Sequence, residues 1–170
     1  MNYELSLKTP NSKILTQRGF GLVEIIVASA VIVSSLLGII SFFIFSQSVM
    51  LRTIRNTEAT ALAEQAMEAV RKLRDDGWSA NVATLTAGTT YYPTISSNKW
   101  TLATTNPAPS SFYTTTVVLS NVNRDSNSNI AATGATDPNT KKAVATVSWR
   151  GGAATKTVVL TTYITNFLGN

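Results

Sequence analysis

The most apolar part of the chain is a single stretch near its N-terminus, residues 20–45, which reads FGLVEIIVASAVIVSSLLGIISFFIF. Glu24 is its one charged residue. A helix needs about 20 apolar residues to cross a bilayer, and a lone segment in lipid must satisfy all of its backbone hydrogen bonds internally. The stretch therefore predicts a transmembrane helix.

The helical pattern continues beyond this stretch, although the composition becomes more polar. No proline interrupts residues 21–77, and the good helix formers Ala, Glu, Arg and Leu dominate the later part of that range. Apolar residues recur there at spacings of four, four and three, which places them on one face of a helix: Leu62, Ala66, Val70 and Leu73. We expect an amphipathic extension over 46–76 that ends near Gly77, with a favourable pair between Glu68 and Lys72.

Residues 77–170 carry the signals of β-strands, because runs rich in Thr, Tyr, Trp and Val alternate with turn residues. Strands are expected over 89–94, 99–104, 112–122, 142–150 and 155–165. Gly151-Gly152 suits a tight hairpin turn between the last two, since glycine tolerates positive φ. The polar residues 123–140 predict a long loop. The fold class is therefore α+β, with a long N-terminal helix packed through its apolar stripe on a small antiparallel β-sheet head.

Composition excludes several classes of function. The chain has no cysteine and no histidine, so it cannot build a thiol nucleophile, an imidazole base or an ordinary zinc site. The formal net charge is +5, but the cations are spread along the chain, so direct nucleic-acid binding is not expected. We expect no enzymatic activity and no cofactor. Three tryptophans are expected in the core of the head and not in a ligand platform: Trp78, Trp100 and Trp149.

The residues that bear most directly on function stand where the N-terminal segment meets the apolar stretch, in the sequence Arg18-Gly19-Phe20-Gly21-Leu22-Val23-Glu24. This sequence resembles the prepilin family, which includes type IV pilins and the pseudopilins of type II secretion systems. Prepilins have a short basic leader that ends in Gly, usually followed by Phe, and a hydrophobic helix with Glu at its fifth mature residue. Gly21 stands where Thr or Ser is more usual. The similarity covers residues 18–45.

The resemblance implies four segments: a cytoplasmic leader over 1–19, a transmembrane helix over 20–45, its amphipathic extension over 46–76 and a β-rich extracytoplasmic head over 77–170. It also implies that a prepilin peptidase cuts between Gly19 and Phe20 and methylates the new amine of Phe20. Glycine suits a tight protease cleft because it has no side chain. The chain would then be a substrate of processing and not a catalyst.

Glu24 is the expected assembly residue. An acidic group inside a bilayer costs about 2.5–3.5 kcal/mol at the centre of a helix, so such residues are usually functional. The resemblance implies that Glu24 pairs with the Phe20 amine of a neighbouring pilin or pseudopilin subunit, after the subunit leaves the lipid of the inner membrane for a pilus or pseudopilus. The alternative for Glu24 is that it only reaches the membrane surface. The sequence does not indicate whether the filament serves motility, adhesion, competence or secretion.

Three other interpretations compete with parts of this account. A signal peptidase could cut after Ala28-Ser29-Ala30, although Glu24 interrupts the preceding apolar region and more apolar sequence follows. The chain could also be an unprocessed, membrane-anchored extracytoplasmic binding module. In the predicted loop, the sequence from Asp125 to Asn129 begins like an EF-hand but lacks the glycine and glutamate that should follow. A looser calcium site formed by Asp125 and Asp137 is the alternative to a solvated polar loop.

Overall fold

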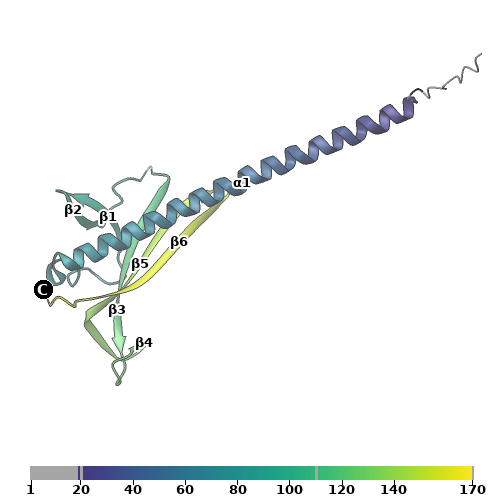
Figure 1. Ribbon diagram of the computed structural model, residues 1–170. Helices are drawn as coiled ribbons and strands as arrows, with labels where there is room; N and C mark the ends of the chain where they lie inside the picture. Colours follow the sequence, from purple (N-terminus) through teal and green to yellow (C-terminus); the bar gives the residue numbers. More distant parts are fainter. Residues whose placement is uncertain (1–18, 20, 110, 170) are drawn as a thin grey trace, which may run out of the picture. The chain divides into compact units, whose positions relative to one another are not determined.

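The computed structural model describes residue 19 and residues 21–109 and 111–169. The chain falls into two compact units, Met1–Ser48 and Val49–Asn170. Helix α1, Leu22–Asp75, begins in the first unit and ends in the second (Figure 1). The helix therefore starts and ends within a few residues of the predicted positions.

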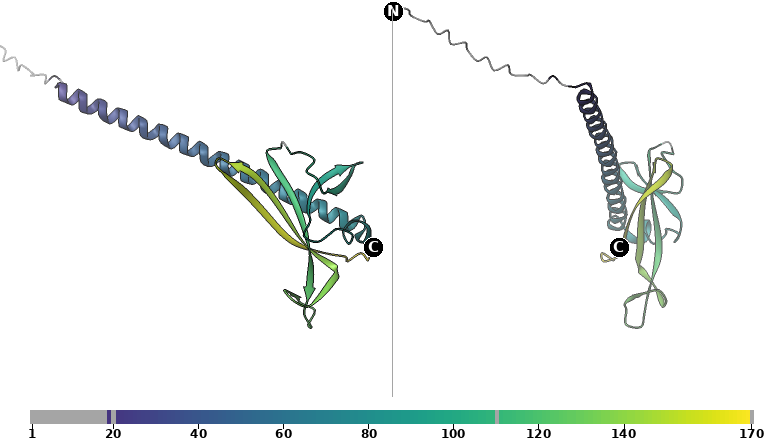
Figure 2. Two further views of the ribbon diagram at one scale, coloured as in Figure 1. Left: turned by 180° about the vertical axis from the view of Figure 1, so that it is seen from behind. Right: turned by 90° about the vertical axis from the view of Figure 1, so that its right-hand side faces the viewer.

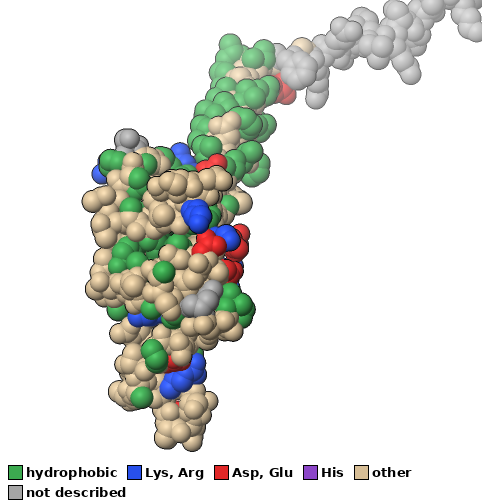
Figure 3. Space-filling model, turned by 90° about the vertical axis from the view of Figure 1, so that its left-hand side faces the viewer, with side chains coloured by type: hydrophobic (Ala, Val, Ile, Leu, Met, Phe, Trp, Pro, Cys, Tyr) green, Lys and Arg blue, Asp and Glu red, His purple; other side chains and the backbone are tan. Residues whose placement is uncertain are grey.

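In the first unit, α1 is exposed and almost entirely apolar, as the green side chains along it show (Figure 3). An 18-residue window has a mean hydropathy of 2.5 with no residue buried, so the helix is long and apolar enough to cross a membrane. Serine hydroxyls in this part each donate a hydrogen bond to a carbonyl oxygen about one turn earlier: Ser29, Ser34, Ser35, Ser41 and Ser48. Such bonds satisfy the hydroxyls within the helix and lower the cost of placing them in lipid.

The second unit contains the rest of α1 and an antiparallel sheet. Its other elements are α2 (Trp78–Asn81), β1 (Thr90–Ser96), β2 (Lys99–Ala103), β3 (Tyr113–Arg124), β4 (Ile130–Ala131), β5 (Ala135–Gly151) and β6 (Ala154–Thr165). The strand order is β2-β1-β3-β5-β6, and β4 pairs with the end of β3. Every strand pair among the described residues is antiparallel. The α+β class and the antiparallel sheet are confirmed.

The β5–β6 hairpin lies beside the second half of α1 (Figure 2). Its pairs run from Thr140 opposite Thr165 to Gly151 opposite Ala154. The turn residues are therefore Gly152 and Ala153, one position later than predicted, because Gly151 still pairs. Gly152 has φ of 82°, the positive value that the first turn position of a type II′ hairpin requires.

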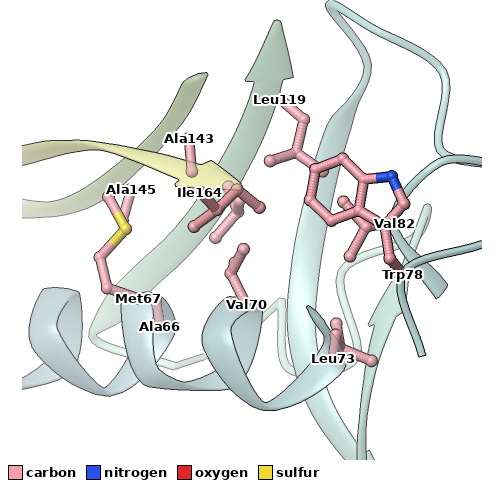
Figure 4. Packing of buried hydrophobic residues seen from close by; sticks show 11 residues of the cluster. Ala66, Met67, Val70, Leu73, Trp78, Val82, Leu119, Ala143, Ala145 and Ile164 are labelled. Atoms are coloured by element: carbon pink, nitrogen blue, oxygen red, sulfur yellow. The ribbon is translucent and has the colours of Figure 1, made fainter. Parts of the chain in front are cut away.

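The second half of α1 packs on the sheet through small and medium-sized side chains (Figure 4). Its buried residues are Ala59, Ala63, Ala66, Met67, Ala69, Val70 and Leu73. The main cluster includes Val117 and Leu119 from β3, Ala143 and Ala145 from β5, and Ile164 from β6. Alanines on both sides allow the helix and the strands to approach closely, as dense core packing requires. The predicted stripe is confirmed.

The tryptophans belong to this packing, as predicted. Trp78 and Trp149 are 2% and 7% exposed, and Trp100 is half-buried against the main cluster. Trp149 lies in a second cluster with Ala59, Ala63 and Val147. The core therefore extends along the hairpin toward the β5–β6 turn.

The predicted loop over 123–140 is much shorter than expected: only residues 125–129 and 132–134 lie outside the strands, and β4 separates these two turns. Strand β3 continues to Arg124, β5 already begins at Ala135, and these two residues pair with each other. The Nε of Arg124 donates to the Oδ2 of Asp137 at 2.6 Å, across the two strands. A register shift after Asn121 accommodates the extra residues on β5. A non-local ion pair therefore extends a ladder through residues whose composition is typical of a loop.

The end of α1 also differs in detail from the prediction. Glu68 pairs with Arg71 at 3.1 Å and not with Lys72, whose ammonium lies 2.8 Å from a carboxylate oxygen of Asp76. Glu68 and Asp76 each lie four residues from Lys72, and the structure pairs Lys72 with Asp76 while Glu68 pairs with Arg71. Gly77 has φ of 141° and ψ of 108°, so it takes a glycine-favouring conformation but not the left-handed helical one.

Candidate functional site at the first turn of the apolar helix

The predicted cleavage site lies just before α1. Gly19 and Gly21 are exposed, whereas Phe20, the predicted methylation site, lies outside the described residues. A Cβ built on Gly19 meets no heavy atom within 4 Å. Packing within the described part of the chain therefore does not require glycine at position 19.

Glu24 caps the N-terminus of α1. Its Oε2 accepts a hydrogen bond from the backbone N–H of Gly21 at 2.9 Å. The carbonyl oxygen of Gly21 accepts in turn from the N–H groups of Glu24 and Ile25, at 3.0 and 3.3 Å. Gly21 is thus the N-cap and Glu24 the third helical residue, which is the carboxylate half of a capping box. A carboxylate in this turn also interacts favourably with the positive end of the helix dipole.

The other half of the capping box is missing because Gly21 has no hydroxyl. A Cβ on Gly21 would lie 3.8 Å from the Oε2 of Glu24, which is an ordinary van der Waals distance. Serine would therefore fit at this position. The sequence pattern did not predict the cap, because the usual signal is Ser or Thr three residues before the glutamate.

Glu24 is chemically isolated along its own helix. The next charged residue of α1 is Arg52, more than seven helical turns later. A single carboxylate can cap a helix, accept hydrogen bonds or hold a cation. An apolar environment strengthens its attraction to a positive charge.

The two calcium candidates stabilise the β3–β5 extension. Asp125 accepts hydrogen bonds from the backbone N–H groups of Asn127 and Asn129, at 2.9 and 2.8 Å, and the bond from Asn129 is the main cause that lowers the pKa of Asp125. The hydrogen bond from Arg124 is the main cause that lowers the pKa of Asp137. No group of three or more potential metal ligands gathers among the described residues. The calcium hypothesis therefore has no ligand cluster to support it within that part of the chain.

A cluster of rings and charges at the β5–β6 end of the sheet was not predicted. The guanidinium of Arg55 lies 5.5 Å from the ring centroid of Phe112, whose ring contacts that of Tyr113 edge-on. The hydroxyl of Tyr113 donates to Glu58 at 2.7 Å. Burial, followed by this hydrogen bond, raises the pKa of Tyr113 to about 12. The available sequence signal was the position of Arg52 and Arg55 soon after the apolar stretch.

These features define a class of protein with one long N-terminal helix. The first part of this helix is exposed, apolar and long enough to cross a membrane, and its second part packs on a small antiparallel β-sheet. No family model matches the chain, and searches of curated proteins and solved structures found no match.

Proposed function

We propose that the chain is a pilin-like structural subunit, a minor pilin or pseudopilin, of a type IV pilus or a type II secretion-like filament. The position of the Gly19-to-Glu24 motif carries the proposal. The motif stands at the first turn of an apolar helix, and the same helix covers an antiparallel sheet at its other end. In this proposal the helix first anchors the subunit in the inner membrane and then packs in the filament core. The chain performs no catalysis.

The first step is processing at the N-terminal end of α1. A prepilin peptidase cuts the peptide bond between Gly19 and Phe20 and methylates the Phe20 amine that is released. Gly19 is exposed, and no atom of the described residues lies within 4 Å of a Cβ built on it, which supports access to this bond. The N-terminal side lies in the cytoplasm and the sheet lies outside it.

The second step changes the partner of Glu24. Before assembly the carboxylate caps its own helix through the N–H of Gly21. After cleavage, the Phe20 ammonium of a neighbouring subunit competes for this carboxylate. The bond from the Gly21 N–H is charged only at its acceptor, whereas a bond from an ammonium is charged at both donor and acceptor. The added attraction between two full opposite charges makes the ammonium the stronger partner. The pair fixes the axial register of neighbouring subunits and relieves the cost of a lone carboxylate in lipid.

The rest of the apolar helix supplies the packing surface. Small residues permit the close approach of neighbouring helices: Ala28, Ala30, Ser34, Ser35 and Gly38. The hydroxyls of Ser34 and Ser35 already bond to the carbonyl oxygen of Val31, so they need no partner from another helix. The same surface is therefore compatible with lipid before assembly and with helices afterwards.

Co-expression of the full chain with a prepilin peptidase tests the proposal. We expect the mature protein to begin with a methylated Phe20, measured by intact mass and N-terminal sequencing. Gly19→Val should block cleavage because the added side chain obstructs the protease cleft. Gly38→Val is the matched control, since a Cβ at Gly38 also meets nothing within 4 Å, and it should be cut normally.

The outcomes separate the competing functions. A chain that stays uncut while the same peptidase processes a known prepilin contradicts the proposal and favours the membrane-anchored binding module. A new terminus directly after Ala30 would identify signal-peptide removal instead.

A further inference from the structure

The β5–β6 end of the second unit carries exposed cations together with exposed apolar side chains. We call this set the basal surface and define it by Arg52, Arg55, Phe112, Arg150 and Lys156. Arg52, Arg150 and Lys156 are exposed, Arg55 is half-buried against Phe112, and Phe112 is 51% exposed.

Packing within the second unit brings these residues to one end. Ala59 and Ala63 of α1 contact Val147 and Trp149 of β5, whereas the later part of the helix contacts Ala143 and Ala145. Strand β5 and helix α1 therefore run in opposite directions, so that residues later in β5 lie beside residues earlier in α1. The β5–β6 turn therefore lies level with the part of α1 that precedes Ala59, where Arg52 and Arg55 are.

Cross-strand pairing completes the basal surface. Trp149 pairs with Lys156 on β6 and with Tyr113 on β3, and Arg150 follows Trp149 directly. Phe112 precedes Tyr113, and their rings are 4.9 Å apart. Arg55 therefore lies over one of the rings, Lys156 stands opposite Trp149 across the strands, and Arg150 follows on the other face of β5, all at the same end of the sheet.

The charge of the basal surface is not neutralised within the described residues. None of its four cations forms an ion pair with a carboxylate there. The carboxylate of Glu58 lies at this end of the sheet too, where it accepts a hydrogen bond from the hydroxyl of Tyr113. The surface thus attracts anions.

Exposed apolar side chains accompany these cations on α1. Val49, Met50, Leu51 and Ile54 are between 42% and 64% exposed, and they continue the apolar pattern of the membrane-compatible segment. Where a helix leaves a bilayer, lipid headgroups surround it, so the side chains on all of its faces contact them. Aromatic rings and long cations mixed with apolar residues are typical of that zone.

We propose that the basal surface binds the anionic headgroups of the leaflet from which α1 emerges. The inference rests on the membrane insertion in the proposed function and adds a lipid class to it. Continuity with the apolar helix favours lipid over the acidic surface of a second copy. Each cation close to an anionic surface contributes about fivefold to the binding equilibrium. Anionic lipid therefore holds the head of an unassembled subunit against the membrane until a filament draws it out.

Single labels on the full chain test this proposal, because the chain has no cysteine of its own. Ala153→Cys places a label in the β5–β6 turn, and Ala132→Cys places the control label beyond β4, at the opposite end of β3. An environment-sensitive fluorophore is attached, and the chain is reconstituted in nanodiscs of phosphatidylcholine with or without phosphatidylglycerol. A nitroxide on the lipid headgroup serves as quencher.

We expect phosphatidylglycerol to increase quenching of the label at position 153 and to leave the label at position 132 unchanged. Arg150→Gln and Lys156→Gln change exposed side chains, so the fold should persist, as circular dichroism checks. Each should weaken the phosphatidylglycerol dependence by about fivefold. Equal quenching in both lipids, or no effect of the two substitutions, overturns the proposal. If the quenching of the label at position 153 instead decreases as the number of chains per nanodisc increases, a second copy of the chain covers the surface, and the lipid proposal is overturned.

A third label separates this inference from the proposed function. A fluorophore at Leu37→Cys, inside the apolar segment, should be quenched by a nitroxide on the acyl chain. If it is not, the chain is not inserted, and both the lipid proposal and the pilin-like function fail. If prepilin peptidase never cuts the chain but position 153 still responds to phosphatidylglycerol, the filament function fails and the lipid proposal stands.

Discussion

Two substitutions at Glu24 separate helix capping from charge pairing. Glu24→Gln retains a side-chain oxygen that can accept the N–H of Gly21, whereas Glu24→Ala removes the acceptor. Neither variant retains the negative charge. If assembly depends on an ion pair with Phe20, both variants should fail, and if it depends on an intact first turn, only alanine should fail.

The expected magnitudes differ between the two roles. Loss of a side-chain cap costs about 0.5–2 kcal/mol, and this cap is exposed, so a value near 1 kcal/mol is expected for alanine. Loss of the charge near the helix dipole costs about 0.3–1 kcal/mol in both variants. Loss of a charged hydrogen bond between subunits costs about 1.5–3 kcal/mol. The last figure corresponds to an association constant lower by about 10- to 150-fold.

Each role has its own assay. In cells that contain the prepilin peptidase and the assembly machinery, the processed chain is quantified in sheared filaments and in membranes. Both variants should be cut normally and should enter filaments at least about tenfold less than the wild type. Hydrogen exchange of the first amides of α1 in nanodiscs reports on the cap, and it should be fastest for Glu24→Ala.

The decisive comparison is between glutamine and glutamate. Wild-type incorporation of Glu24→Gln, together with poor incorporation of Glu24→Ala, would refute the pairing argument and leave capping as the role of this residue. Normal incorporation of both variants would remove Glu24 from assembly altogether.

Three further predictions concern local stability. Gly21→Ser should complete the capping box and raise the free energy of opening of the first turn, measured by hydrogen exchange, by a few tenths of a kcal/mol. Faster exchange would contradict the assigned cap. Leu119→Ala, at a fully buried position, should lower the free energy of unfolding by about 3–4 kcal/mol, measured by a denaturant titration followed by tryptophan fluorescence. Val159 is 54% exposed, so Val159→Ala should lower it by less than about 1 kcal/mol. Equal losses would contradict the assignment of Leu119 to the core. Since Arg124 lowers the pKa of Asp137 below its ordinary value of 3.8, the stability from this pair is present above pH 3.8 and is lost as pH falls through the lowered pKa. Asp137→Asn should remove that acid-dependent loss and cost about 1 kcal/mol at neutral pH, and an unchanged acid profile would count against the pairing.

Local pattern predicted the long helix, its apolar stripe and most strands because each depends on spacing within a few residues. Ala66, Val70 and Leu73 show the helical period, and within the strand expected over 155–165 the side chains from Val158 to Ile164 are alternately less and more exposed. The buried positions confirm both patterns. The bilayer-length apolar segment is equally local, because it depends on composition alone.

Contacts between distant residues account for what was missed. Arg124 and Asp137 extend β3 and β5 through polar residues that resemble a loop, and the composition of this segment does not show which of its residues pair or in which register. Arg55 meets Phe112 only after the helix has packed on the sheet. The cap at Glu24 is local, but glycine at its N-cap lacks the hydroxyl that usually identifies it.

The N-terminal sequence of the protein extracted from the membranes of its own cells tests the central claim most directly. The account predicts that the chain begins with a methylated Phe20, so that a new amine can meet a carboxylate on the adjacent subunit. An intact peptide bond between Gly19 and Phe20, or a chain that starts beyond Ala30, would contradict it.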